Sequence, residues 1–186
     1  MVPIPEALRA TVLQRLFRLA PAERRILTQA AAIGRNVELD VLAAVAGRSV
    51  AGVRAIMERA ADLQLVRQCA PSRYSFRHAM TRDIIYAESF SAAARTIHRR
   101  IACVLERLRG CDRSALADLA YHAWAAGDSA RTLRYNELAG DGAAAVHARE
   151  DARQFYTRAR SFIRIDSPDF VRLTAKLQSL DGSLHK

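Results

Sequence analysis

Hydrophobic residues recur at helical spacing over most of the chain. In the first third, three such stretches begin near Glu6, Pro21 and Leu39, and a glycine that can terminate a helix follows each of the last two. A fourth stretch follows Ser49, a residue type that often caps a helix N-terminus. Its apolar face is formed by Val53, Ile56, Met57, Ala60 and Leu63. The pattern therefore predicts four short helices before residue 64.

The period of the pattern changes in the middle of the chain. Two short stretches of strand type, residues 65–69 and 73–76, flank an Ala-Pro-Ser loop. From Met80 onward, apolar residues recur again at helical spacing. We therefore expect a β-hairpin followed directly by a helix, with Arg77 and His78 at the junction where strand becomes helix.

Everything downstream of this junction has helical spacing. The most regular apolar stripe runs from Ile97 to Leu108, and we place His98, Arg99 and Arg100 on its polar side. Four further helices are predicted, over residues 115–126, 129–147, 150–163 and 169–180.

Small residues recur seven positions apart in two of these helices. Thr132 and Ala139 form one pair, Ala152 and Ala159 form the other, and a tyrosine lies near the second turn of each helix. This spacing is similar to the small and aromatic positions of tetratricopeptide (TPR) helices, whose repeat is ~34 residues, and about one and a half such units fit the sequence.

Together these patterns predict a fold that is mainly all-α. We expect a winged helix-turn-helix with a short β-hairpin, followed by TPR-like helical hairpins. The winged-helix domain is expected at residues 1–110, the start of the repeat at 111–165, and a C-terminal helix with a tail at 166–186.

The charge of the chain is compatible with an anionic partner or with a solvated surface. The net charge is +10, and almost all of it comes from arginine because Lys176 and Lys186 are the only lysines. The excess lies in the middle, where residues 64–110 contain nine arginines and three carboxylates. A basic centre suits nucleic acid, a nucleotide phosphate or an acidic protein face, and it suits a surface that meets only solvent equally well.

Several classes of protein and site are disfavoured. No run of ~18 apolar residues and no secretion signal is found, so we expect a cytoplasmic protein with no membrane partner. Cys69, Cys103 and Cys111 form no C-x-x-C pair, which argues against a cysteine zinc site or a disulfide framework. Walker A, serine-hydrolase and zinc-protease motifs are missing, and the histidines do not pair at i,i+4. We therefore predict no enzymatic activity and no cofactor in this chain.

The junction after the hairpin carries the strongest candidate site. Arg82 lies four residues after His78 and hence on the same helical face, and Arg77 directly precedes the histidine. These three side chains can offer charged donors to a phosphate at a helix start. The alternative interpretation is a histidine that caps the helix or is satisfied locally.

A winged helix-turn-helix can also read DNA, in which case the fourth helix enters the major groove. Arg48 and Arg54 are the basic residues near its start that would contact DNA. Glu58 and Asp62 follow on the same helix, and carboxylates that face DNA are repelled by its phosphates. Direct DNA binding by this helix is therefore the less favoured alternative.

Five blocks of sequence follow one another in a characteristic order: Pro21-Ala-Glu-Arg-Arg-Ile-Leu27, Ala31-Ala-Ile-Gly34, Leu42-Ala-Ala-Val-Ala-Gly47, Tyr74-Ser-Phe-Arg-His-Ala-Met-Thr-Arg-Asp-Ile-Ile-Tyr86 and His98-Arg-Arg-Ile101. The chain thereby resembles the STAND regulatory ATPases. More narrowly, it is similar to the stretch that follows the ATPase core in large ATP-binding LuxR-type regulators and in ATPase-linked adenylate cyclases.

The resemblance implies a winged-helix domain that joins a nucleotide-binding core to a helical-repeat sensor. It also implies that His78 matches a histidine that approaches the phosphate of the bound nucleotide in the resting state. The P-loop core is missing from this sequence, so ATP or ADP would be bound by a parent or partner protein. The expected partners are this ATPase core, in cis or in trans, and proteins that bind the helical repeat.

Two functional hypotheses follow. The first is a non-enzymatic regulatory module, the winged-helix and repeat-start portion of a STAND-type, ATP-dependent transcriptional or cyclase-linked regulator. The second is a stand-alone winged-helix DNA-binding transcriptional regulator, which the net charge and the hairpin favour and the acidic fourth helix does not. A steep loss of DNA affinity with added salt, together with a preference for one sequence, would support the second hypothesis.

Overall fold

The computed structural model describes residues 5–89, 94–110 and 112–182. Within these ranges the protein is mostly helical, with ten α-helices and one small antiparallel sheet of three strands. The chain divides into two compact units, Met1–Val104 and Leu105–Lys186. None of the helices in the described ranges has the length and hydropathy that a transmembrane span requires.

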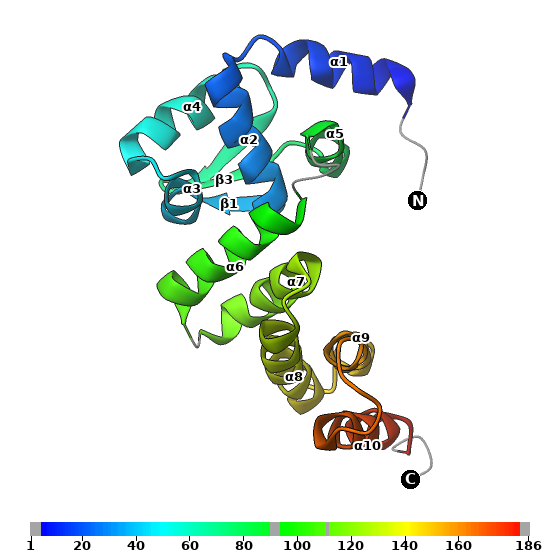
Figure 1. Cartoon of the computed structure of the whole chain (residues 1–186). Helices are drawn as coiled ribbons and strands as arrows, with labels where there is room; N and C mark the ends of the chain where they lie inside the picture. The colour runs from blue at the N-terminus through cyan, green and yellow to red at the C-terminus, as the bar shows by residue number, and fades with distance from the viewer. Residues whose placement is uncertain (1–4, 90–93, 111, 183–186) are drawn as a thin grey trace. The chain divides into compact units, whose positions relative to one another are not determined.

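The first unit combines short helices with the sheet (Figure 1). Its elements are α1 (Glu6–Leu16), α2 (Pro21–Ile33), β1 (Asn36–Glu38), α3 (Leu39–Ala46), α4 (Val50–Asp62), β2 (Val66–Ala70), β3 (Arg73–Phe76), α5 (Ala79–Ser89) and most of α6 (Ala94–Arg109).

Local signals set the ends of these helices where the sequence predicted them. Pro21 opens α2 at its first position. Gly47 ends α3 with φ of 65°, a left-handed conformation that glycine adopts without steric penalty. The Ser49 hydroxyl accepts a hydrogen bond from the Gly52 N–H at 3.2 Å and caps α4. The predicted end of α3 at Gly47 and the predicted starts of α2 and α4 are confirmed.

The predicted hairpin is present, and a third strand completes the sheet. β2 and β3 pair antiparallel, with Val66 opposite Phe76. β1 pairs with the other edge of β3, with Val37 opposite Tyr74, so β3 is the central strand. The sequence analysis missed β1 because its three residues are too few to show a period.

The central strand anchors the core of the first unit. Tyr74 and Phe76 share one face of β3, and each is 1% exposed. They belong to one cluster that also takes side chains from α1 to α5. Its fully buried members include Leu27, Leu39, Leu42, Met57, Leu65 and Ile85. Large aliphatic and aromatic side chains thus hold the start of α5 beside the sheet.

The second unit is a series of helices in which each packs against the next (Figure 1). Its elements after α6 are the 3-10 turn η1 (Arg113–Ala115), α7 (Leu116–Ala126), α8 (Ser129–Ala145), α9 (Arg149–Arg160) and α10 (Pro168–Gly182). The small and aromatic positions that recur with helical spacing are buried: Thr132, Tyr135, Ala139, Ala152, Tyr156 and Ala159. Gly140 permits the close approach of α8 and α9, because a Cβ there would lie 2.4 Å from Tyr156 Cε1.

The division between the two units falls inside α6, whereas the sequence analysis placed it at residue 110. The last turn of α6 belongs to the second unit, where Glu106 accepts hydrogen bonds from Arg131 and Tyr135 of α8. At the other end, Leu173 of α10 is buried in one cluster with Tyr156 of α9. The segment from residue 166 to 182 is therefore part of the second unit.

Candidate functional site

Backbone hydrogen bonds fix the junction between β3 and α5. The Phe76 N–H donates to the Arg35 carbonyl at 3.1 Å, and the Arg77 N–H donates to the Leu65 carbonyl at 3.2 Å. The His78 carbonyl then accepts from the N–H three residues later at 3.1 Å, which starts α5. The position of His78 at the start of the helix is therefore set by the backbone of its neighbours.

The three predicted site residues lie at this junction, but their side chains have different surroundings. His78 is exposed, and its side chain forms no hydrogen bond with a described residue. Arg77 is also exposed and donates to the side-chain carbonyl of Gln64. Arg82 is half-buried, and its Nε donates to the Ala31 carbonyl of α2 at 2.8 Å. Arg77 and His78 are thus at the surface, whereas Arg82 is hydrogen-bonded to the backbone of α2.

The contacts of Arg82 link α5 to α2. A separation of four residues places Arg82 on the same helical face as His78. Its long side chain nevertheless reaches α2 and also pairs with Asp83 at 3.2 Å. Its guanidinium carbon lies 5.6 Å from the Tyr86 ring centroid. The phosphate site at Arg77, His78 and Arg82 stays a prediction, with two of its residues at the surface and Arg82 half-buried.

A buried histidine lies near Arg82 and was not predicted to be a functional residue. His98 is 1% exposed, and its Nε2 lies 2.8 Å from the Tyr86 hydroxyl, which joins α6 to α5. Burial lowers the pKa of His98, and the nearby charge of Arg82 lowers it further. The expectation that His98 lies on the polar side of α6 is wrong. The available signal was its spacing of three and seven residues from Ile101 and Leu105.

The candidate DNA-contacting residues also differ in their surroundings. Arg48 is exposed in the turn before α4. Arg54 is half-buried, and its guanidinium donates to the Pro71 carbonyl of the hairpin loop at 2.6 Å. Arg54 therefore holds the hairpin against α4. Glu58 and Asp62 of α4 are exposed, so the accessible side of this helix carries the carboxylates that the sequence analysis noted.

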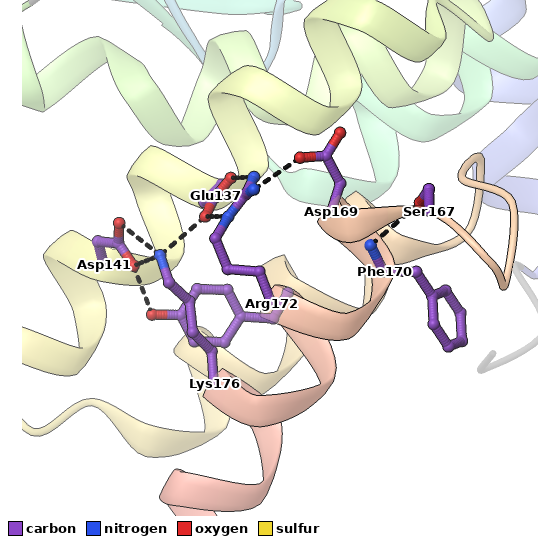
Figure 2. A network of polar contacts seen from close by, with 8 residues as sticks. Glu137, Asp141, Ser167, Asp169, Phe170, Arg172 and Lys176 are labelled. Atoms are coloured by element: carbon purple, nitrogen blue, oxygen red, sulfur yellow. Dashed lines mark hydrogen bonds and ion pairs between the residues drawn. The ribbon is translucent and has the colours of Figure 1, made fainter.

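A polar network joins the last three helices of the second unit (Figure 2). Arg172 of α10 donates to both carboxylate oxygens of Glu137 of α8, at 2.9 and 2.8 Å. Lys176 donates to Glu137 at 2.9 Å and to Asp141 at 2.6 Å. The Tyr156 hydroxyl of α9 donates to Asp141 at 2.7 Å. Figure 2 shows these side chains converging between α8 and α10.

The network changes the titration of its members. Hydrogen bonds from Arg172, opposed by burial and reinforced by Lys176, lower the pKa of Glu137 to about 2. Burial and the hydrogen bond to Asp141 raise the pKa of the Tyr156 hydroxyl. Arg172 and Lys176 both contact carboxylates, so we interpret the network as a set of contacts that hold α8, α9 and α10 together.

No group of histidine, cysteine, aspartate and glutamate side chains in the described ranges could hold a metal ion. Cys69 and Cys103 are free and exposed, and Cys111 lies outside the described residues. No protein-family model matches the sequence, and no curated protein matches it.

Proposed function

We propose that this protein is a non-enzymatic regulatory module of a STAND-type, ATP-dependent regulator, of the transcriptional or cyclase-linked kind. In this proposal the first unit is a winged helix, and the second is the start of a TPR-like repeat. The order of helices, hairpin and stacked helices supports the proposal, as do the buried small residues of the second unit. The module acts in the cytoplasm by contact with a nucleotide-binding ATPase core, in cis or in trans, while the repeat binds protein partners.

The exposed side chain of His78 is the observation that carries the proposal. Its backbone is fixed by the junction, while its imidazole has no hydrogen-bond partner among the described residues. Arg77 lies next to it, also exposed, and adds a positive charge. An imidazole and a guanidinium at the start of a helix are suitable donors to a phosphate oxygen. The pair is available to a partner without any cost to the core.

A contact of this kind can operate a switch. A ligand shifts an equilibrium between two states only through a difference in its affinity for them. If His78 and Arg77 contact the phosphate of ADP in the resting state, the contact stabilises that state relative to the ATP-bound state. When the contact is lost, the resting state is no longer favoured and the module can change to the ATP-bound state. The binding energy of two hydrogen-bond donors to a phosphate can bias such an equilibrium, because a difference of 1.4 kcal/mol changes an equilibrium constant about tenfold.

The alternative, a stand-alone winged-helix DNA-binding regulator, has less support. Arg54 is bonded to the hairpin loop, and Arg59 of α4 pairs with Glu23 of α2. The exposed side of α4 retains Glu58 and Asp62. Arg48 alone of the two predicted contact residues is exposed, and one arginine gives little base readout.

Photo-crosslinking in cells that produce the protein tests the proposal. A benzophenone amino acid replaces His78 in one variant and Arg48 in a matched variant, because both positions are exposed in the first unit. We expect position 78 to cross-link to a polypeptide segment that contains a P-loop. Cross-links from position 48 to DNA, with none from position 78 to a P-loop protein, would instead establish the alternative.

Calorimetry on the purified chain supplies a second test. We expect no ATP hydrolysis and no measurable ATP affinity, because the sequence lacks the Walker A loop and its lysine. A dissociation constant near 1 μM, equivalent to roughly −8 kcal/mol, would show that the chain binds nucleotide without a core and would contradict the proposal as stated.

A further inference from the structure

The first unit contains a cleft that the nucleotide-contact proposal does not use. Its volume is 720 Å³, within the range of about 300–1,000 Å³ that is typical of small-molecule sites. The end of α1, one face of α2, the end of α5 and the first turns of α6 line it. The lining residues are Leu16, Phe17, Pro21, Arg24, Arg25, Thr28, Gln29, Glu88, Thr96, Ile97 and Arg100.

The charged residues of the cleft are mainly cationic. Arg24, Arg25 and Arg100 form no ion pair with any described residue. Glu88 is the one acidic lining residue, and it already pairs with Arg9 at 3.1 Å. The sequence of residues 1–4 and 90–93 contains no aspartate or glutamate that could neutralise the arginines. The cleft therefore offers positive charge that the unit itself does not balance.

The remaining lining gives the cleft an apolar character beside this charge. Phe17 is 58% exposed, although a phenylalanine of this size is usually buried. The Arg24 guanidinium carbon lies 4.9 Å from the centroid of its ring. Leu16 and Ile97 add aliphatic surface. A flat apolar body could pack on Phe17 while an acidic group meets the arginines.

Gln29 provides a polar group that can orient a ligand. Its side-chain carbonyl oxygen is buried and has no hydrogen-bond donor among the described residues. A buried acceptor without a donor is unfavourable, so a rotation of this amide that turns the oxygen toward the cleft would let a ligand N–H or O–H satisfy it.

From these observations we propose that the cleft binds a small organic acid, with an aromatic or similarly apolar body and a carboxylate or sulfonate group. The acidic group interacts with Arg25 and Arg100, and the body packs on Phe17. Guanidinium groups bind planar carboxylates through paired hydrogen bonds, which makes the site selective for the anion over a neutral molecule of the same shape. This inference does not depend on the contact of His78 with a nucleotide.

A fluorescence titration with 1-anilinonaphthalene-8-sulfonate tests the proposal on the full chain. The probe has an apolar body and one sulfonate, and its emission increases in an apolar site. We expect saturable binding to a single site. We also expect 2-naphthoate to displace the probe and 2-naphthamide, its neutral counterpart, to displace it at least about tenfold less well.

Two neighbouring arginines of α6 give a matched pair of variants. Arg100 lines the cleft, whereas Arg99 is exposed on the same helix and does not. We expect Arg100→Gln to weaken 2-naphthoate binding about tenfold and Arg99→Gln to leave it unchanged. Phe17→Ala should weaken both the acid and the amide, because it removes the apolar contact. Thermal melts of each variant check that the fold is retained.

Three results would overturn the inference. Equal displacement by the acid and the amide would remove the role of charge. Equal losses of 2-naphthoate affinity in Arg99→Gln and Arg100→Gln would show that binding depends on the overall charge of the first unit and not on a contact with Arg100. Failure of the wild-type chain to bind the probe below millimolar concentration would show that the cleft is not a site. None of these results bears on cross-linking from position 78, so the two proposals fail separately.

Discussion

The two units of this protein use their charged residues in different ways. The first unit, residues 1–104, contains 16 arginines and 8 carboxylates, which leaves a net charge of +8. The second, residues 105–186, contains 13 basic and 11 acidic residues, a net charge of +2. The first unit is held by large apolar side chains, and the second by small residues between helices and by ion pairs across them.

This difference separates the two units by the positive charge that each leaves without a carboxylate partner. In the second unit, Arg172 and Lys176 are paired with Glu137, so their positive charge is neutralised in contacts between helices. The first unit also has ion pairs between elements, such as Arg9 with Glu88 and Arg59 with Glu23, but its arginines outnumber its carboxylates two to one, so arginines remain at the surface and in the cleft. An anionic partner therefore finds more uncompensated positive charge on the first unit.

The largest expected effect is a truncation in the core of the first unit. Leu27 is fully buried in α2, so Leu27→Ala should lower the free energy of unfolding by about 2–5 kcal/mol. Leu138→Ala is the control in the second unit, where the side chain is 43% exposed and the cost should be below about 0.5 kcal/mol. Urea unfolding followed by circular dichroism measures both. Similar losses of unfolding free energy for Leu27→Ala and Leu138→Ala would contradict the difference between the two units.

A glycine pair in α8 tests the close packing of the second unit. Gly140→Ala should destabilise this unit by about 1–3 kcal/mol, because its Cβ would overlap the Tyr156 ring. Gly142→Ala in the same helix meets nothing within 4 Å and should stabilise it by about 0.5–1 kcal/mol. Trp124, the single tryptophan, lies in α7 and reports the unfolding of this unit by fluorescence. Stabilisation by both variants would refute the close approach of α8 and α9.

The sequence carried most of the information about these elements because their signals are local. Ser49, Gly47 and Pro21 each set a helix end through contacts within a few residues, and each lies where it was predicted. The small residues of α8 and α9 were found from their spacing. β1 was missed because a strand of three residues is defined by its partner β3, which is distant in sequence.

Titration of Glu137 should destabilise the second unit in acid. Its pKa is about 2 in the folded protein and 4.5 ordinarily, so its contribution is complete above pH 4.5. The contribution is lost as the pH falls from 4.5 to about 2. We expect a loss of about 1–2 kcal/mol by Trp124 fluorescence, after allowance for solvent screening. Glu137→Gln should lower stability at pH 7 and flatten this pH dependence; an unchanged acid profile in Glu137→Gln would exclude the network as its cause.

The first unit should respond at higher pH through His98. Burial lowers the folded pKa of this histidine below its ordinary 6.5, so the unfolded chain binds the proton more readily. Stability is therefore complete above pH 6.5 and declines as the pH falls through and below that value. Hydrogen exchange of α5 and α6 peptides, compared at pH 7.5 and 5.5 after correction for intrinsic rates, measures the effect. A His98→Gln variant with the same pH dependence would contradict it.

The candidate site was less predictable than the fold because its side chains act over long distances. The sequence located Arg77 and His78 at the junction, since the change of period marks that position. It could not show that Arg82 reaches the Ala31 carbonyl, 51 residues away in sequence. The sequence also could not show the contact between His98 and Tyr86, because these two residues lie on separate helices. Polar contacts between elements leave no period in the sequence.

The smallest expected effect on stability is that of His78. The side chain is exposed and has no described partner, so His78→Ala should change the free energy of unfolding by less than about 0.5 kcal/mol. Arg82→Ala should cost more, about 1–2 kcal/mol, because it leaves the Ala31 carbonyl without its donor. Equal stability losses for the two variants would contradict the separation of a surface histidine from an internal arginine.

The most direct test measures the release of labelled ADP from the assembled regulator that carries either the wild-type chain or His78→Ala. The variant should release ADP faster and raise basal signalling, while its melting curve stays that of the wild type. An unchanged rate of ADP release, together with a loss of stability above roughly 2 kcal/mol, would show that His78 is a structural residue and would contradict the account.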